Sequence, residues 1–357
     1  MKLNENRNAE IDFFRILFAV VVVISHSDGL QPNDLKKFPF VGGYLAVEFF
    51  FILSGYFAVK QVPAFSSRYQ MVPVWTWNKY KRIFTYVIPA VIIHYLINAY
   101  ITGLSFFDTI KSLLYGVFEM FLFPMTGLRE TFFVLPLWYL SAMLILLPLF
   151  YAALLKNKDL FLYVLCPVFA LLIYGYYSVT TQHIARWSDW NGLFFMSLPR
   201  AWAGLCLGGI VTVITERLLC PLSFNKWGTI FLSGVEIICI GIVIFYMYTR
   251  SYRRLDFLCI GLIVILVSII LSEKASIHKI FPLLFSKISE FSLSLYVSHW
   301  TVRLLIPTVI MPAASYEARL LPYILLSAVY ALLLMVFVFM VRRFKLPEKI
   351  RRLILQI

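Results

Sequence analysis

Apolar runs recur along the whole chain, and most approach the ~20 residues that an α-helix needs to cross the ~30 Å hydrocarbon core of a bilayer. The backbone finds no water in hydrocarbon, so each run must satisfy its own hydrogen bonds as a helix. The pattern therefore predicts an all-α fold, a polytopic transmembrane helix bundle of about ten spans. The predicted spans are residues 11–30, 41–60, 83–102, 132–154, 160–178, 192–214, 228–248, 255–272, 286–306 and 319–341.

One apolar segment interrupts this series. Residues 104–126 carry Asp108, Lys111 and Glu119, so we expect an interfacial or re-entrant helix and not a full crossing. The sequence contains no long polar loop, internal repeat or low-complexity tract. We therefore expect a single integral membrane domain over residues 1–357.

The composition agrees with a membrane protein. Of the 357 residues, 61% are hydrophobic and 14% are charged, and the mean hydropathy is +0.84. A soluble domain keeps about a quarter of its residues charged. The first apolar run carries Arg15 and His26 and lacks a small-residue cleavage site, which argues against a cleaved signal peptide. The five cysteines occur singly in or beside apolar runs, so we expect core residues and neither a metal site nor a disulfide.

The formal charge of +14 is distributed around the spans. Basic residues flank apolar runs as the positive-inside rule expects, so we do not expect nucleic-acid binding. With the N-terminus in the cytoplasm, the inner segments hold roughly twenty Lys and Arg against about nine outside. Arg250, Arg253 and Arg254 fall outside in this arrangement and disagree with it. We expect a multi-pass protein of the cytoplasmic membrane with both termini inside.

Two ionisable residues in the first span need a reason, because a charged side chain in hydrocarbon costs at least ~2.5–3.5 kcal/mol. Arg15 and His26 are eleven residues apart, which returns them to within about 20° on one helix face, ~16 Å apart along its axis. We interpret them as a functional pair that faces the bundle interior, with Arg15 near the cytoplasmic mouth. The alternative is a snorkelling arginine and a hydrogen-bonded structural histidine.

The second span supplies a carboxylate at a comparable depth. Glu48 would orient the His26 imidazole and raise its basicity, as a general base needs. The alternative is a simple buried ion pair. Gly55 shares the face of Glu48, and Gly204 and Gly208 lie in a later span; small residues let helices approach closely.

Later spans bring more polar groups to this depth. Arg200 enters one span from its outer end. Another span carries a polar stripe with i, i+4, i+7 and i+11 spacing, formed by Ser292, Tyr296, His299 and Arg303. Together with His26 and Glu48 these residues predict a polar cavity near mid-membrane. His94 and Glu236 have no evident partners, and we interpret them as structural.

Basic residues gather where the third span begins. Lys79, Lys81 and Arg82 lie at the expected cytoplasmic mouth of the cavity, where such side chains can bind phosphates. Ordinary flanking charge is an equally weighted alternative.

These motifs resemble the acyltransferase 3 family of bacterial integral membrane acyltransferases, and the resemblance covers nearly the whole chain. The family's arginine–x10–histidine motif corresponds to Arg15 and His26, and VEFFFILSGYF places Glu48 in the family's acidic position. In KYKRIFTYVIPA, Lys79 replaces the first arginine of the family's R-x-x-R motif. Weaker matches are LPLWYLSAM, with Trp138 and Tyr139, and FSLSLYVSHW, with Ser294, Tyr296 and His299.

The resemblance implies a membrane-embedded O-acyltransferase that moves acetyl from cytoplasmic acetyl-CoA to a hydroxyl of a cell-surface or exported carbohydrate. It implies no permanently bound cofactor, since acetyl-CoA or another acyl-CoA is the donor, and a carbohydrate or lipid-linked glycan as acceptor. We expect His26, Glu48 and Arg15 to be catalytic. The donor phosphates would lie near Lys79, Lys81 and Arg82. The groups expected to bind substrate or stabilise an oxyanion are Arg200, Tyr296, His299, Arg303, Trp138 and Tyr139.

The rival hypothesis is a proton-coupled transporter or flippase of a small polar solute or glycan precursor. It also accounts for intramembrane His, Glu and Arg, because proton relays use the same residues. It explains the basic cluster less well, and it predicts internal repeats that the sequence does not show convincingly.

Overall fold

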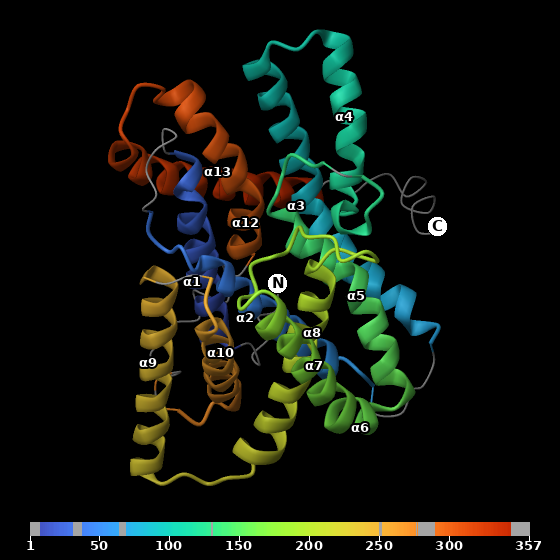
Figure 1. Ribbon diagram of the computed structural model, residues 1–357, viewed down its shortest axis with the longest axis vertical. Helices are drawn as coiled ribbons and strands as arrows, with labels where there is room; N and C mark the ends of the chain where they lie inside the picture. Colours follow the sequence, from blue (N-terminus) through green and yellow to red (C-terminus); the bar gives the residue numbers. More distant parts are fainter. Residues whose placement is uncertain are drawn as a thin grey trace.

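The computed structural model describes residues 8–30, 38–63, 69–129, 131–249, 252–275, 277 and 290–343, and this part contains helices and no β-strand (Figure 1). The α-helices are α1 (Ala9–Ser25), α2 (Ala46–Lys60), α3 (Met71–Thr102), α4 (Phe106–Met120), α5 (Leu137–Lys156), α6 (Lys158–Leu160), α7 (Cys166–Thr180), α8 (Ser197–Val213), α9 (Lys226–Thr249), α10 (Leu255–Ser272), α12 (Phe291–Leu305) and α13 (Tyr316–Arg343). Short 3₁₀ and π segments extend several of them. Arg250 lies outside the described residues.

Nine helices of the described part are long and apolar enough to cross a membrane, so the chain is a multi-pass membrane protein. Helix α1 has 17 residues and lies in the bundle core, where Phe18 and Ala19 are fully buried. The all-α polytopic bundle is therefore confirmed. Some boundaries differ from the prediction. Helix α3 begins at Met71 and not at 83, because the aromatic and basic residues before its apolar run continue the same helix.

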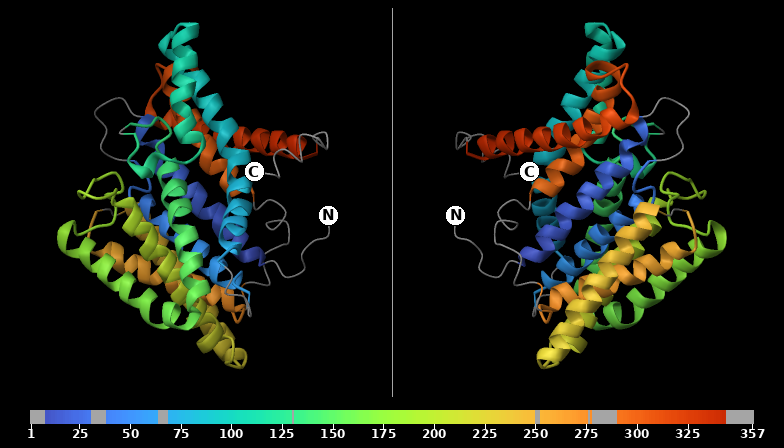
Figure 2. Two further views of the ribbon diagram at one scale, coloured as in Figure 1. Left: turned by 90° about the vertical axis from the view of Figure 1, so that its right-hand side faces the viewer. Right: turned by 90° about the vertical axis from the view of Figure 1, so that its left-hand side faces the viewer.

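The segment after α3 turns back alongside it. Gly103 adopts φ +65° and ends α3, and the Ser105 side chain caps α4 by accepting from the Asp108 N–H. Helices α3 and α4 form a hairpin that projects beyond the rest of the bundle (Figures 1 and 2). Glu119, fully buried, accepts hydrogen bonds from the Phe133 and Val134 N–H groups and anchors the return to α5. Helix α4 has 15 residues and is not among the helices long and apolar enough to cross a membrane; its expected interfacial or re-entrant position stays a prediction.

Helices α2 and α8 pack with their backbones in close approach in the bundle core. A Cβ atom at Gly55 would overlap the Leu205 carbonyl, and one at Gly208 would overlap the Ile52 carbonyl. These glycines therefore let the two backbones touch, which is the geometry that small residues permit between membrane helices.

Helix α12 packs against α1, α3 and α13, and it runs in the same direction as α1. The last helix, α13, crosses the bundle at a steep angle to most other helices (Figure 2). Its end returns to the end of the bundle at which α1 begins, where Arg342 binds Glu290 beside the first residues of α12.

Candidate active site

Two cavities enter the bundle from opposite ends. We call the first the basic cavity, because Arg15, Lys79 and Arg82 line it; together with the solvent space at its mouth it measures about 1000 Å³. We call the second the histidine cavity, because His26 lines it; measured in the same way it is about 940 Å³. The basic cavity lies where α1 and α3 begin. The histidine cavity lies where α1 ends and α2 begins, under the loop that contains Trp187.

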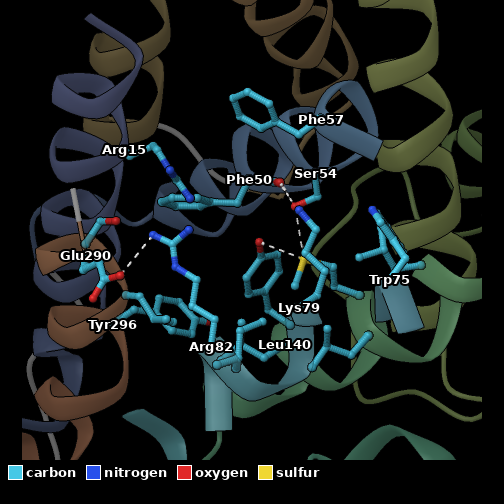
Figure 3. Close-up of a pocket in the computed structure, with 17 residues that line it drawn as sticks. Arg15, Phe50, Ser54, Phe57, Trp75, Lys79, Arg82, Leu140, Glu290 and Tyr296 are labelled. Atoms are coloured by element: carbon cyan, nitrogen blue, oxygen red, sulfur yellow. Dashed lines mark hydrogen bonds and ion pairs between the residues drawn. The ribbon is translucent and has the colours of Figure 1, made fainter. Parts of the chain in front are cut away.

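The basic cavity combines cationic groups at its mouth with an apolar interior. Figure 3 shows the side chains of Arg15, Lys79 and Arg82 directed into it. Asp12 holds Arg15 from one helical turn away, at 3.5 Å. Further inside, the wall is formed mainly by the apolar and aromatic side chains Phe50, Phe57, Ile83, Tyr139, Leu140, Met143, Leu144, Leu147 and Leu293.

Glu290 is the carboxylate of this cavity. It binds Arg82 at 3.4 Å and Arg342 at 2.9 Å, and it accepts a 2.6 Å hydrogen bond from the Tyr86 hydroxyl. Burial by itself raises the pKa of the Glu290 carboxyl, but the Tyr86 hydrogen bond and the charges of Arg82 and Arg342 bring that pKa below its ordinary value. Glu290 is therefore ionised and fixes Arg82 at the mouth. Three cationic side chains against one carboxylate leave the cavity net positive.

Lys81 does not join this cavity, contrary to the expectation for the basic cluster. Its ammonium lies 5.6 Å from the centre of the exposed Trp77 ring, and the side chain is exposed. The reason is helical geometry: Lys79 and Arg82 are three residues apart and share a face, whereas Lys81 is turned by about 200° from Lys79.

The histidine cavity is lined largely by aromatic side chains. Trp138 and Trp187 stack with ring centres 5.5 Å apart and an interplanar angle of 13°. Tyr44 and Tyr252 stack at 5.3 Å on the same cavity. The Tyr44 hydroxyl donates to the buried Asp256 carboxylate at 2.7 Å, so this wall is fixed by hydrogen bonds as well as by packing.

His26, which lines this cavity, contacts the fully buried His299 behind it. His299 Nε2 lies 3.3 Å from His26 Nδ1, and His299 Nδ1 lies 3.3 Å from the Leu295 carbonyl. Arg303 Nε donates to the His26 carbonyl at 2.8 Å and Nη2 to Asp28 at 3.2 Å. Two residues of the stripe predicted on α12, His299 and Arg303, therefore face the end of α1.

Gly29 leaves room for the Arg303 guanidinium that binds Asp28. A Cβ atom at this position would overlap the Arg303 guanidinium. The turn after α1 is stabilised by the Gly29 N–H, which donates to the Asp28 carboxylate at 2.8 Å.

Glu48 does not contact His26; the expected pairing is wrong. Its carboxylate accepts from Arg200 Nε at 2.7 Å and from the Tyr174 hydroxyl at 2.7 Å, and Glu48 and Arg200 are both fully buried. The close approach of α2 and α8 brings these two residues together and turns Glu48 away from α1.

Arg200 lines neither cavity. Its Nη2 donates to the Tyr44 carbonyl at 2.7 Å, and its guanidinium lies 5.1 Å from the centre of the Trp138 ring. Arg200 therefore supports two walls of the histidine cavity from behind, which differs from the substrate contact expected of it.

Tyr296 is the side chain that the two cavities share among the described residues. Its hydroxyl donates to the Pro136 carbonyl at 2.6 Å, and its ring lies 5.6 Å from Tyr139 and 6.0 Å from His299, centre to centre. Tyr139 lines the basic cavity and Trp138 the histidine cavity. The wall between the cavities is thus one aromatic layer.

The residues interpreted as structural are buried. His94 Nδ1 lies 3.2 Å from the Thr301 hydroxyl, so this histidine has a partner that the sequence did not reveal. Glu236 is 2% exposed. Cys166, Cys206, Cys239 and Cys259 are buried and Cys220 is exposed, and all five are free thiols.

Sequence reasoning missed several residues of the site. Asp28 and Gly29 come two and three residues after His26, and an Asp-Gly pair after a span signals a turn. Glu290 directly precedes an apolar helix. An acidic residue is favourable at a helix N-terminus, and this position was the signal that could have drawn attention to it. Trp187 lies in a loop, and no local pattern assigned it to a cavity.

The comparisons with known proteins decide the family. A family model described as an acyltransferase domain, acyltransferase 3, matches residues 8–343, nearly the whole chain. The chain belongs to the acyltransferase 3 family. No curated protein and no solved structure matches it. As an acyltransferase 3 protein with membrane-spanning helices throughout, the chain is a membrane acyltransferase, and its two cavities are the candidate sites of that reaction.

Proposed function

We propose that this membrane acyltransferase takes an acetyl group from acetyl-CoA in the basic cavity and transfers it to a carbohydrate hydroxyl in the histidine cavity. The observation that carries the proposal is the pair of cavities, which enter from opposite ends and meet at Tyr296. A donor and an acceptor that approach from opposite sides of a membrane need this arrangement.

The basic cavity suits an acyl-CoA. Lys79 and Arg82 at the mouth match the phosphates of such a donor, since Arg and Lys bind phosphate by charge-assisted hydrogen bonds. The apolar interior beyond them suits the pantetheine arm, which would pass Arg15 on the way to Tyr296. This assignment makes the end of the bundle with the basic cavity the cytoplasmic one, with both termini inside.

The histidine cavity suits a sugar. Its wall presents the Trp138–Trp187 stack and the Tyr44–Tyr252 stack, and aromatic faces pack against the apolar C–H face of a sugar ring. A few fixed polar groups then orient the ligand, as in most small-molecule sites. Asp28 and Arg303 supply them at the rim.

His26 supplies the acid–base chemistry by one of two routes. As general base, a ring nitrogen removes the acceptor hydroxyl proton while the oxygen attacks the thioester carbonyl; the C–S bond breaks, and the protonated imidazole returns the proton to the departing thiolate. As nucleophile, the same nitrogen attacks the thioester and releases the thiol. The departing thiolate takes the imidazole N–H proton. The acyl-imidazole then acylates the hydroxyl, whose proton returns to the imidazole. Both routes give one ester and free CoA.

Purified protein in lipid nanodiscs tests the proposal. The donor is acetyl-CoA labelled in its acetyl group, and the acceptor probe is a lipid-linked glycan extract of the producing cells. We expect release of free thiol and label in the glycan, and loss of at least about 1000-fold of this transfer in His26→Ala. Undiminished transfer by His26→Ala contradicts the assigned site. An intact thioester with movement of solute across a bilayer would support a transporter instead.

A further inference from the structure

The hydrogen bonds around His299 fix where the protons lie on both histidines. A carbonyl oxygen only accepts, so the 3.3 Å contact with the Leu295 carbonyl requires a proton on His299 Nδ1. A neutral imidazole carries one N–H, which leaves His299 Nε2 as an acceptor. His26 Nδ1, 3.3 Å away, must then be the donor.

Both rings are neutral in this arrangement. His299 is fully buried, and within the described residues no carboxylate makes a hydrogen bond to either ring. A buried charge without such a partner is costly, and the Arg303 guanidinium, bound to the His26 carbonyl, adds a like charge nearby.

We infer that His299 is a positioning residue that holds the His26 proton on Nδ1 and thereby leaves the Nε2 lone pair free toward the histidine cavity. His299 takes the place that the sequence suggested for Glu48. The inference rests on the proposed function, because both routes described above need an unprotonated ring nitrogen at the substrate. It assigns that nitrogen as Nε2.

The contact geometry supports orientation as well as tautomer. The two imidazoles lie with centres 5.2 Å apart and an interplanar angle of 29°, and the Trp300 ring meets His26 edge-on at 5.5 Å. Because His299 is held by its own helix through Leu295, one end of the chain of hydrogen bonds is rigid. His26 lies just beyond the last turn of α1, so the contacts with His299 and Trp300 orient its ring from α12.

The kinetic test compares His299→Leu, which removes the acceptor, with His299→Gln, whose amide oxygen can still accept from His26. We expect His299→Leu to lower kcat at least about 100-fold with KM for acetyl-CoA within twofold. His299→Gln should recover at least about tenfold of that loss. Ser294→Ala is the matched control, because within the described part of the chain this buried hydroxyl on the same helix donates to the Ala331 carbonyl and to nothing else; it should retain wild-type transfer.

A double variant separates positioning from independent catalysis. If His299 acts only through His26, then His26→Ala with His299→Leu is no slower than His26→Ala alone. A double variant that is clearly slower, or a His299→Leu protein with wild-type kcat, overturns the inference.

A spectroscopic measurement keeps the inference testable if no acyl transfer is detected or if His299→Leu fails to fold. Nitrogen-15 NMR of histidine-labelled wild-type protein distinguishes protonated from unprotonated ring nitrogens, and His26→Asn identifies the His26 signals by their disappearance. We expect His26 to carry its proton on Nδ1 in the absence of any substrate. The opposite tautomer, or a doubly protonated ring, refutes the assignment irrespective of the reaction catalysed.

Discussion

The two cavities are built by different physical means. In the basic cavity, charged groups lie near solvent: the Arg82 side chain is 50% exposed, and its ion-pair partner Glu290 is 27% exposed. In the histidine cavity, the walls are supported from behind by the Glu48–Arg200 pair, which is fully buried. Exposed charges bind an anionic ligand and can rearrange around it. A buried hydrogen-bonded frame instead fixes the shape of a site, and it fails as a unit when one member is removed.

The largest effect expected from this comparison is structural. Glu48→Gln leaves the buried Arg200 charge without its counterion, which costs about 3–5 kcal/mol. We expect a marked fall in the thermal unfolding midpoint of the protein in nanodiscs. The double variant Glu48→Leu with Arg200→Met removes both charges and should recover much of that loss. A Glu48→Gln protein that unfolds at the wild-type temperature would show that the pair does not support the fold.

The basic cavity should respond in binding and not in stability. Arg82→Ala is expected to raise KM for acetyl-CoA about 10–100-fold, because a hydrogen bond to a charged group contributes about 1.5–3 kcal/mol. The change in unfolding midpoint should be small. Lys81→Ala is the matched control, since Lys81 faces away from the cavity. Equal effects of Arg82→Ala and Lys81→Ala on KM would favour ordinary flanking charge over a donor site.

A smaller effect is expected where the two cavities meet. Tyr296→Ala removes the shared wall, so water from the histidine cavity reaches the thioester, and we expect donor hydrolysis relative to transfer to rise about tenfold. Tyr296→Phe keeps the ring and loses the hydrogen bond to the Pro136 carbonyl. Its ratio of donor hydrolysis to acyl transfer should therefore stay closer to that of the wild type. Thiol release without acceptor measures hydrolysis directly. An unchanged ratio in Tyr296→Ala would mean that Tyr296 does not separate donor from water.

Periodic features of the site were predictable from the sequence. The spacing of Arg15 and His26 and the stripe on α12 follow from helix geometry within single segments. The structure places Arg15 on α1 and His26 in the 3₁₀ turn after it, and it brings His299 and Arg303 of the stripe to His26. One refinement follows from the structure: Arg15 and His26 line different cavities. The sequence could place them on one face but could not show that Tyr296 closes the space between them.

The partner of Glu48 was not predictable from depth alone. Glu48 and Arg200 are 152 residues apart in the sequence. Both His26 and Arg200 were expected at the depth of Glu48, so depth did not decide which of the two is its partner. The discriminating signal was packing. Gly55 lies on the Glu48 face, and Gly208 lies on the Arg200 helix, and their backbone contacts pair α2 with α8. Lys81 is a different case, because the helical angle between positions 79 and 81 already separates their side chains.

Helix α12 contributes to both cavities along one continuous register. Ser292 lines the basic cavity, Arg303 lines the histidine cavity, and Tyr296 lines both. Deleting one residue near the start of α12 would rotate every later side chain relative to the earlier ones by about 100°. Such a change would displace Tyr296, which separates the two cavities, together with His299 and Arg303. Substitutions can therefore alter one cavity during evolution, whereas insertions and deletions in this helix would disrupt both.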